Sequence, residues 1–132
     1  MIYDVIIIGS GPAGLAAGVY AQRARLSSII IEKEYMSGGQ ILNTYEVDNY
    51  PGLPGINGFD LGMKLREHCE GLGAEFVTAE VEKVSLAEDG QTKLVQTAEE
   101  TYQAKTVILA MGARHRLLEV PGEEEFTGMG VS

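Results

Sequence analysis

Short, wholly apolar runs recur along the chain, separated by segments with a different pattern. Residues 5–8 and 29–31 are such runs, and residues 106–110 (Thr-Val-Ile-Leu-Ala) form another. Runs of this length predict strands that are buried on both faces, as in a parallel sheet. A helix of small residues is expected between the first two runs, and residues 59–72 are expected to form a second helix that ends at a pair of glycines.

The other expected strands are short. Residues 74–78 have the pattern of a third parallel strand. A meander of three antiparallel strands is predicted for residues 81–86, 93–97 and 101–104, because short polar turns separate these segments. The pattern therefore predicts an α/β fold with a parallel sheet, helices and a small antiparallel meander.

The segment after the first strand carries the glycine motif Gly9-Ser10-Gly11-Pro12-Ala13-Gly14. Gly9 allows a tight turn, Gly11 lets the backbone approach a pyrophosphate, and Gly14 lets the helix pack closely on the sheet. Pro12 falls just inside the helix, where its missing N–H removes no hydrogen bond. The free N–H groups and the positive end of the helix dipole then face a phosphate.

An acidic residue follows the second strand. Glu32 lies eighteen residues after Gly14, where its carboxylate is placed to accept hydrogen bonds from the ribose of an adenine dinucleotide. A carboxylate there repels a 2′-phosphate, which disfavours NADP in this first site, whereas FAD or NAD fits. Strand, glycine loop, helix, second strand and acid are all in register, which predicts a Rossmann-like domain rather than an isolated glycine turn.

Residues 33–58 show little periodicity, yet they hold too many apolar side chains for a disordered segment. Long irregular segments inside compact domains are usually functional, so a loop that wraps a ligand is expected. Gln40 and Asn49 carry amides that both donate and accept, which suits the edge of a flavin ring. Gly112, just after the 106–110 strand, would let the backbone come close to a ligand at the carboxyl edge of the sheet.

Composition narrows the function classes. The chain has 132 residues, a length typical of one domain, and its net charge of −9 argues against nucleic acid or an anionic membrane as a partner. No apolar run approaches a membrane span and no signal peptide is visible, so a cytoplasmic location is expected. Cys69 is the single cysteine, so it forms no intrachain disulfide, and it builds no zinc site with two scattered histidines. Packing in the core or a half-exposed thiol is expected for it, and not the role of a nucleophile.

Together these motifs resemble the FAD domain of bacterial thioredoxin reductases, in the pyridine nucleotide-disulfide oxidoreductase family. The resemblance covers essentially the whole chain, in order. The combination Gly38-Gly39-Gln40 with Glu-Val-Asp-Asn-Tyr-Pro-Gly at 46–52 points to this branch. It is supported by the glycine loop and Glu32, by 108–113, and by 120–122 and 126–132, which resemble the crossing into an NADPH domain. Met111 stands where the family usually has Thr.

The resemblance implies a set of cofactor-binding residues and no catalytic residue in this chain. The glycine loop would hold the FAD pyrophosphate, Glu32 the adenosine ribose, and the backbone at 80–81 the adenine. The full set is Gly9, Ser10, Gly11, Pro12, Ala13, Gly14, Glu32, Lys33, Gly38, Gly39, Gln40, Asn49, Glu80, Val81, Ala110 and Gly112. No metal ligand is expected.

The resemblance also implies an order of segments. Residues 1–118 would be the first segment of a discontinuous FAD-binding domain, and residues 119–132 a linker toward an NADPH-binding domain. In the family a redox-active Cys-x-x-Cys follows soon after the position of Ser132, before the NADPH site and a returning segment of the FAD domain. The chain as given is therefore expected to be an amino-terminal portion, incomplete at its C-terminus and inactive alone.

In the parent enzyme, electrons would pass from NADPH through FAD and a protein disulfide to thioredoxin or a similar disulfide protein, and a homodimer is expected. Two alternatives stay open: a related reductase that serves ferredoxin or a peroxidase system, and a non-catalytic nucleotide-binding module. The isolated chain is expected to be marginally stable, to dimerise, or to need FAD to stay folded.

Overall fold

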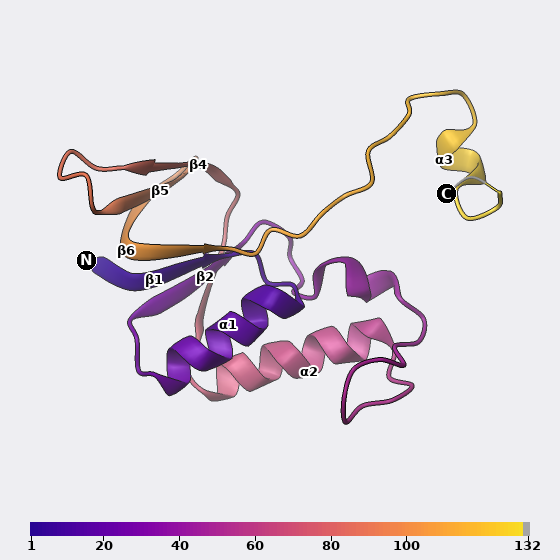
Figure 1. Cartoon of the computed structure of the whole chain (residues 1–132), viewed down its shortest axis with the longest axis horizontal. Coiled ribbons are helices and arrows are strands. Elements are labelled where there is room, and N and C mark those ends of the chain that lie inside the picture. Colours follow the sequence, from indigo (N-terminus) through magenta and orange to yellow (C-terminus); the bar gives the residue numbers. More distant parts are fainter. Residues whose placement is uncertain (131–132) are drawn as a thin grey trace.

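The computed structural model describes residues 1–130. One six-stranded sheet runs through it, in the order β3-β2-β1-β6-β5-β4 (Figure 1). The parallel part consists of β1 (Ile2–Ile8), β2 (Ser28–Glu32), β3 (Glu75–Thr78) and β6 (Thr101–Leu109). The antiparallel meander consists of β4 (Val81–Leu86), β5 (Lys93–Thr97) and the first part of β6. The predicted α/β fold, with a parallel sheet and a meander, is confirmed.

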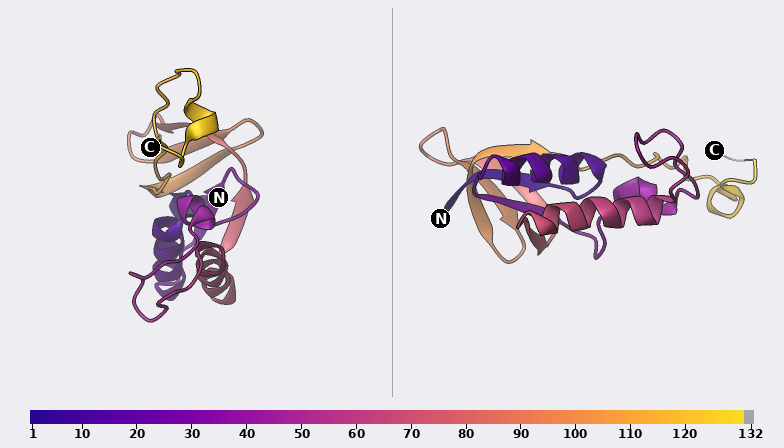
Figure 2. Two further views of the ribbon diagram at one scale, coloured as in Figure 1. Left: turned by 90° about the vertical axis from the view of Figure 1, so that its right-hand side faces the viewer. Right: turned by 90° about the horizontal axis from the view of Figure 1, so that it is seen from below.

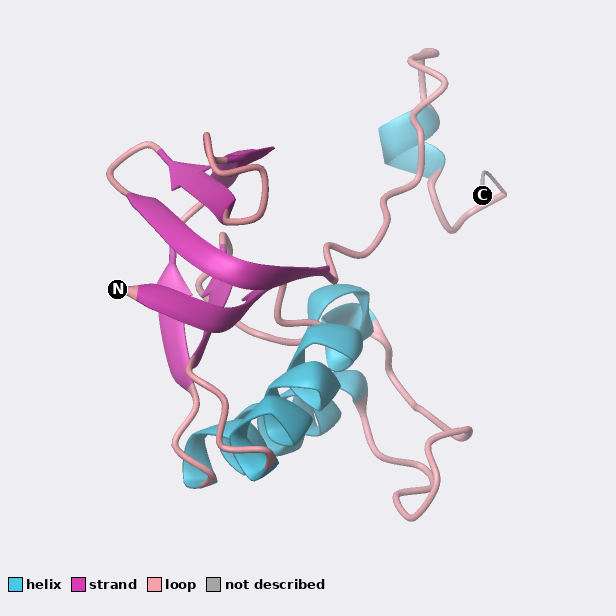
Figure 3. Ribbon diagram, turned by 60° about the vertical axis from the view of Figure 1, so that its left-hand side comes forward, coloured by secondary structure: helices cyan, strands magenta, loops and turns pink. Residues whose placement is uncertain are grey.

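Two helices cover one face of the parallel strands. They are α1 (Pro12–Arg23) and α2 (Gly58–Gly71), which lie side by side beneath the sheet (Figures 1 and 2). The meander lies on the other side of the parallel strands from these helices (Figure 3). None of the helices within residues 1–130 is long and apolar enough to cross a membrane.

The central strands are buried on both faces, which explains their continuous apolar sequence. Toward the helices, Val5, Ile7 and Ile30 pack with Ala21 of α1. On the opposite face, the other residues of the same strands pack with one residue each from β5 and β6, in a cluster of Ile6, Ile8, Ile29, Ile31, Val95 and Ala104. Alternate side chains of β1 and β2 thus supply two separate cores.

The prediction of two strands within 101–110 was wrong. Residues 101–104 and 106–110 were expected to be separate, but β6 is one strand that pairs with β5 on one side and with β1 on the other. Between the two expected strands lies Lys105, which is neither Gly nor Pro, so nothing interrupts the extended backbone. Its ammonium pairs with Asp4 of β1 at 2.7 Å.

The segments outside the sheet and the two long helices also contain local helical structure. A 3₁₀ helix, η1 (Gly39–Asn43), lies within the segment that was expected to be an irregular loop. Residues 111–120 are exposed and lead away from the sheet to a single helical turn, α3 (Glu123–Phe126), where the sequence predicted a linker (Figure 1). The expected domain boundary at residue 118 remains a prediction, and residues 131–132 lie outside the described residues.

Candidate functional site

The candidate site lies at the carboxyl edge of the parallel strands. β1, β2 and β6 end there side by side, and two backbone hydrogen bonds join the segments that follow. The N–H of Gly9 donates to the Ile31 carbonyl at 2.9 Å, and the N–H of Ala110 donates to the Ile8 carbonyl at 2.8 Å. Residues far apart in the sequence are therefore held at one edge, where open α/β sheets bind ligands.

Two glycines of the motif are required by close packing. Gly9 has a φ of +105°, and a Cβ on it would overlap the carbonyl of Ala110. A Cβ on Gly14 would overlap the carbonyl of Gly9, so this glycine lets α1 pack against the end of β1. Gly11 differs, because a Cβ on it would meet no atom closely. The atoms nearest to such a Cβ would be the Gly38 carbonyl oxygen at 3.9 Å and the Gly39 Cα at 4.0 Å. Its missing side chain leaves space open instead of avoiding a collision.

The first turn of α1 is uncapped. Gly11 is the N-cap and offers no side-chain acceptor, no acidic residue lies in the first turn, and Pro12 occupies the start of the helix as predicted. The N–H of Leu15 is bonded to the Gly11 carbonyl at 2.9 Å. The N–H groups before it have no partner within the helix. A phosphate can supply the missing acceptors and interacts favourably with the positive end of the helix dipole.

Glu32, at the end of β2, is joined to the glycine loop. Its Oε2 accepts the Ser10 N–H at 2.8 Å and the Ser10 hydroxyl at 2.7 Å, while Oε1 accepts the Glu34 N–H at 3.0 Å. Partial burial by itself raises the pKa of the Glu32 carboxyl, but the hydrogen bonds from Glu34 and Ser10 outweigh that effect. The pKa therefore lies below its usual value, and Glu32 is a carboxylate at neutral pH.

The Gly38-Gly39-Gln40 segment lies against the glycine loop. The N–H of Gly38 donates to the Ser10 carbonyl at 2.8 Å. A Cβ on Gly39 would be 3.5 Å from the Gly11 Cα, so these two glycines face each other. The Gln40 amide donates to the carbonyl of Ala113, just beyond β6. This segment thus reaches both the start of α1 and the turn that contains Gly112.

Other predicted residues lie farther from this cluster. The N–H of Ala79 donates to the Glu32 carbonyl at 3.0 Å, which places the neighbouring Glu80-Val81 backbone near the end of β2. Lys33 is exposed next to Glu32. Asn49 is exposed in the loop before α2, which extends away from the sheet (Figure 3). None of the hydrogen bonds found within residues 1–130 joins Asn49 to the glycine loop.

Sequence reasoning missed two side chains that support the site. The Ser37 hydroxyl is buried and accepts a hydrogen bond at 3.0 Å from Arg66, a residue of α2. The i,i+4 spacing of Arg66 and Glu70 signals their ion pair, but nothing in the sequence connects Arg66 with Ser37.

Cys69 is buried with its thiol 3.0 Å from the Leu15 carbonyl, which fits the expected packing role. Within residues 1–130 no cluster of three potential metal-ligating side chains occurs.

A parallel sheet with a glycine loop, an uncapped helix and a carboxylate at one edge defines a dinucleotide-binding domain. The chain belongs to the pyridine nucleotide-disulphide oxidoreductase family, whose family model matches residues 3–132. It is 46% identical over 132 residues to the thioredoxin reductase of Bacillus subtilis, with 99% of this chain and 40% of the relative covered. The chain thus spans about 40% of the length of that relative, and it corresponds to the amino-terminal portion of thioredoxin reductases.

Solved structures agree with this assignment. The crystal structure of Lactococcus lactis thioredoxin reductase superposes with a TM-score of 0.86 at 43% identity, covering 96% of this chain and 41% of that one. A ferredoxin-flavin thioredoxin reductase from Clostridium acetobutylicum superposes with a TM-score of 0.78 at 35% identity, covering 98% and 44%. The family uses FAD and NADPH. The open space at Gly11, the uncapped α1 and the ionised Glu32 fit the pyrophosphate and ribose of FAD.

Proposed function

We propose that this chain is the FAD-binding portion of an NADPH-dependent thioredoxin-disulfide reductase of the cytoplasm. Residues 1–118 would form the first segment of the FAD-binding domain, and residues 119–132 the linker toward the NADPH-binding domain. The observation that carries this proposal is the uncapped start of α1, with the Glu32 carboxylate and the Gly38-Gly39 segment beside it.

Each part of the site has a separate task in this proposal. The N–H groups of the first turn of α1 bind the pyrophosphate, and Glu32 accepts hydrogen bonds from the adenosine ribose. The adenine lies toward the 80–81 backbone. The flavin side is lined by Gly38, Gly39, Gln40 and Asn49, with Ala110 and Gly112 flanking the cofactor. FAD, when bound, accepts a hydride and passes its electrons onward.

Reduction of a disulfide is assigned to the longer parent protein and not to these 132 residues. A disulfide reductase needs a dithiol that receives electrons from the flavin. The chain contains a single cysteine, Cys69, and its thiol is buried beneath α1. We therefore expect no thioredoxin reduction by the chain alone. In the parent, thioredoxin or a similar disulfide protein is the partner, and the enzyme is a homodimer.

Flavin retention tests the proposal. The purified chain is mixed with excess FAD, passed through a desalting column, and its visible spectrum is compared with that of the Gly11→Ala variant. FAD binding at this loop is supported if the wild-type chain retains about one flavin per chain and the variant retains none. A wild-type chain that stays colourless but binds NAD or AMP tightly would instead indicate a nucleotide-binding module without redox chemistry.

A ferredoxin-linked reductase is the second candidate. It is favoured by the similarity to the Clostridium acetobutylicum ferredoxin-flavin thioredoxin reductase. The parent protein distinguishes the two candidates when its flavin is reduced under anaerobic conditions. Rapid bleaching of the flavin by NADPH supports the first candidate, whereas bleaching by reduced ferredoxin alone supports the second.

A further inference from the structure

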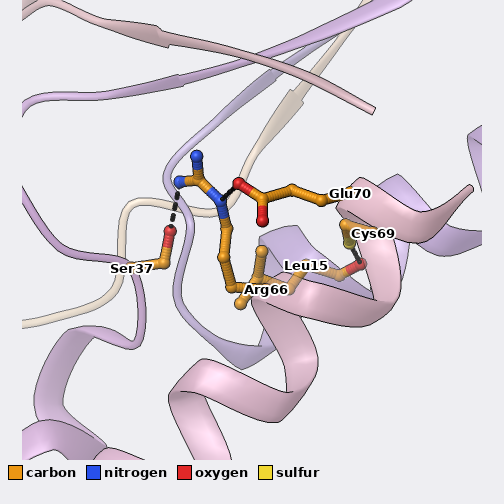
Figure 4. Close-up of polar contacts among 5 residues, drawn as sticks. All are labelled: Leu15, Ser37, Arg66, Cys69 and Glu70. Carbon is orange, nitrogen blue, oxygen red and sulfur yellow. Dashed lines mark hydrogen bonds and ion pairs between the residues drawn. The ribbon is translucent and has the colours of Figure 1, made fainter. Parts of the chain in front are cut away.

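Arg66 of α2 is held in place by three different contacts, of which Figure 4 shows the two polar ones, to Ser37 and Glu70. Its Nη1 donates to the Ser37 hydroxyl at 3.0 Å, and its Nε donates to the Glu70 carboxylate at 2.6 Å. The guanidinium carbon also lies 3.3 Å from the centre of the Phe76 ring in β3, a cation–π contact. Two hydrogen bonds in different directions and one stacked face fix both the position and the plane of this group.

The hydroxyl that Arg66 binds belongs to a closely packed segment. Ser37 is 2% exposed, so its hydroxyl needs a partner within the protein. One helical turn before Arg66, Gly62 lets the same segment lie directly on α2, since a Cβ there would be 3.3 Å from the Gly38 Cα. The helix therefore holds residues 37–38 at two points, by close backbone approach at Gly62 and by a charged hydrogen bond from Arg66.

The segment held in this way is the one that contacts the glycine loop. The Gly38 N–H, next to Ser37, donates to the Ser10 carbonyl at 2.8 Å. The following residue, Gly39, faces Gly11 at the N-terminus of α1. Both glycines have positive φ values, +125° and +62°, so the local backbone conformation depends on its surroundings as well as on its sequence.

We propose that Arg66 is a positioning residue for flavin-nucleotide binding: it fixes Ser37 and thereby sets Gly38 and Gly39 against the glycine loop, without touching the ligand. The proposal rests on FAD binding at the glycine loop. A lysine at position 66 keeps the positive charge but lacks the planar group that donates in two directions and stacks on Phe76. Charge alone therefore does not replace Arg66.

The test uses the full chain with Arg66→Lys and Ser37→Ala as parallel variants and Glu70→Gln as the matched control. Glu70→Gln removes the exposed charge partner but leaves the bond from Arg66 to Ser37 in place. FAD affinity is measured by quenching of flavin fluorescence. Hydrogen exchange of the Gly38 N–H is followed by NMR, with the Ile6 and Ile7 amides as internal references.

Arg66→Lys and Ser37→Ala should each weaken FAD binding roughly tenfold, the effect of losing one charge-assisted hydrogen bond. Exchange at Gly38 should accelerate roughly tenfold in both variants, while Ile6 and Ile7 keep their protection. Glu70→Gln should change either quantity by less than about twofold. The proposal would be overturned if the Arg66→Lys variant had the FAD affinity of the wild-type chain and the same rate of hydrogen exchange at Gly38. Equal acceleration at Ile6, Ile7 and Gly38 would also overturn it, because that pattern reports global destabilisation.

The exchange measurement keeps the two proposals separate. If the wild-type chain binds no FAD, the proposed function fails, and Gly38 exchange alone decides the role of Arg66. Faster exchange at Gly38 in Arg66→Lys but not in Glu70→Gln then supports the positioning of the segment. Unchanged exchange in both variants counts against it.

Discussion

The Glu32 carboxylate accepts two hydrogen bonds from a single residue, Ser10: one from its N–H at 2.8 Å and one from its hydroxyl at 2.7 Å. Ser10 lies in the glycine loop, and Glu32 ends the neighbouring strand β2. This pair therefore fixes the acidic group relative to the loop before any ligand arrives. Because the Ser10 bonds use one carboxylate oxygen and the Glu34 N–H only part of the other, Glu32 keeps acceptor capacity for a ribose hydroxyl.

Stability should depend on the ionisation of Glu32. The hydrogen bonds lower its pKa in the folded state, so their stabilising contribution is present above the usual value near 4.5 and is lost as the pH falls through the lowered pKa. Glu32→Gln should lower the free energy of unfolding by about 1 kcal/mol at pH 7. Urea denaturation at pH 7 and at low pH checks this, because the difference from wild type should shrink on acidification. A difference independent of pH would contradict the assignment.

Alanine should affect mainly the stability of the fold at position 9 and mainly flavin binding at position 11. In Gly9→Ala the new methyl group overlaps the Ala110 carbonyl at a positive φ, so the fold should lose about 2 kcal/mol or more. Gly11→Ala meets only ordinary contacts, and weaker capping should cost about 0.5–1 kcal/mol. The methyl group of Gly11→Ala should nevertheless abolish flavin retention, because it occupies the space left open for the pyrophosphate. Thermal melts paired with visible spectra measure both effects, and a well-folded Gly9→Ala variant would show that the overlap is relieved by movement.

FAD should stabilise the chain as its concentration rises. A ligand that binds only the folded state adds about 2.7 kcal/mol at a hundredfold excess over Kd. The melting temperature should therefore climb with the logarithm of FAD concentration, and riboflavin, which lacks the pyrophosphate, is the matched control. An equal shift with riboflavin would place the binding energy on the ring instead of at the start of α1.

Cys69 should be unreactive while the chain is folded. Burial raises the pKa of its thiol, which removes the reactive thiolate, and packing beneath α1 blocks access to the sulfur. A chromogenic disulfide reagent should label this cysteine only at the rate of unfolding, and labelling should become fast in urea. Cys69→Ala should destabilise the chain by about 1 kcal/mol, because it empties space next to Gly18 of α1. Rapid labelling of the native chain would contradict this burial.

The sequence was most informative where one local pattern determines the structure. The strand, glycine loop and helix from β1 to α1 follow from residue types a few positions apart, so their arrangement was predicted correctly. Glu32 was correctly placed at the end of β2 for the same reason. The additional contact of Glu32 with Ser10 was not predicted, because it depends on the register between two strands.

The remaining features depend on contacts between distant segments. Arg66 and Ser37 are 29 residues apart, and no periodic pattern joins them. The continuity of β6 was missed because its first half reads as meander and its second half as buried parallel strand, although both halves belong to one strand. The exposed position of Asn49 was not foreseen either, since an irregular loop carries no repeating pattern that fixes its direction.

The pairing of β1 with β6 has a consequence for how the chain acquires its fold during synthesis. Ile2 of β1 lies opposite Gln103 of β6, so β1 emerges from the ribosome about 100 residues before one of its two neighbours. Until β6 arrives, the glycine loop lacks the Ala110 backbone against which Gly9 packs. Contacts so distant in sequence form late and slowly. The nucleotide site should therefore be completed after translation of nearly the whole segment, and a nascent chain halted before β6 should not yet bind the cofactor.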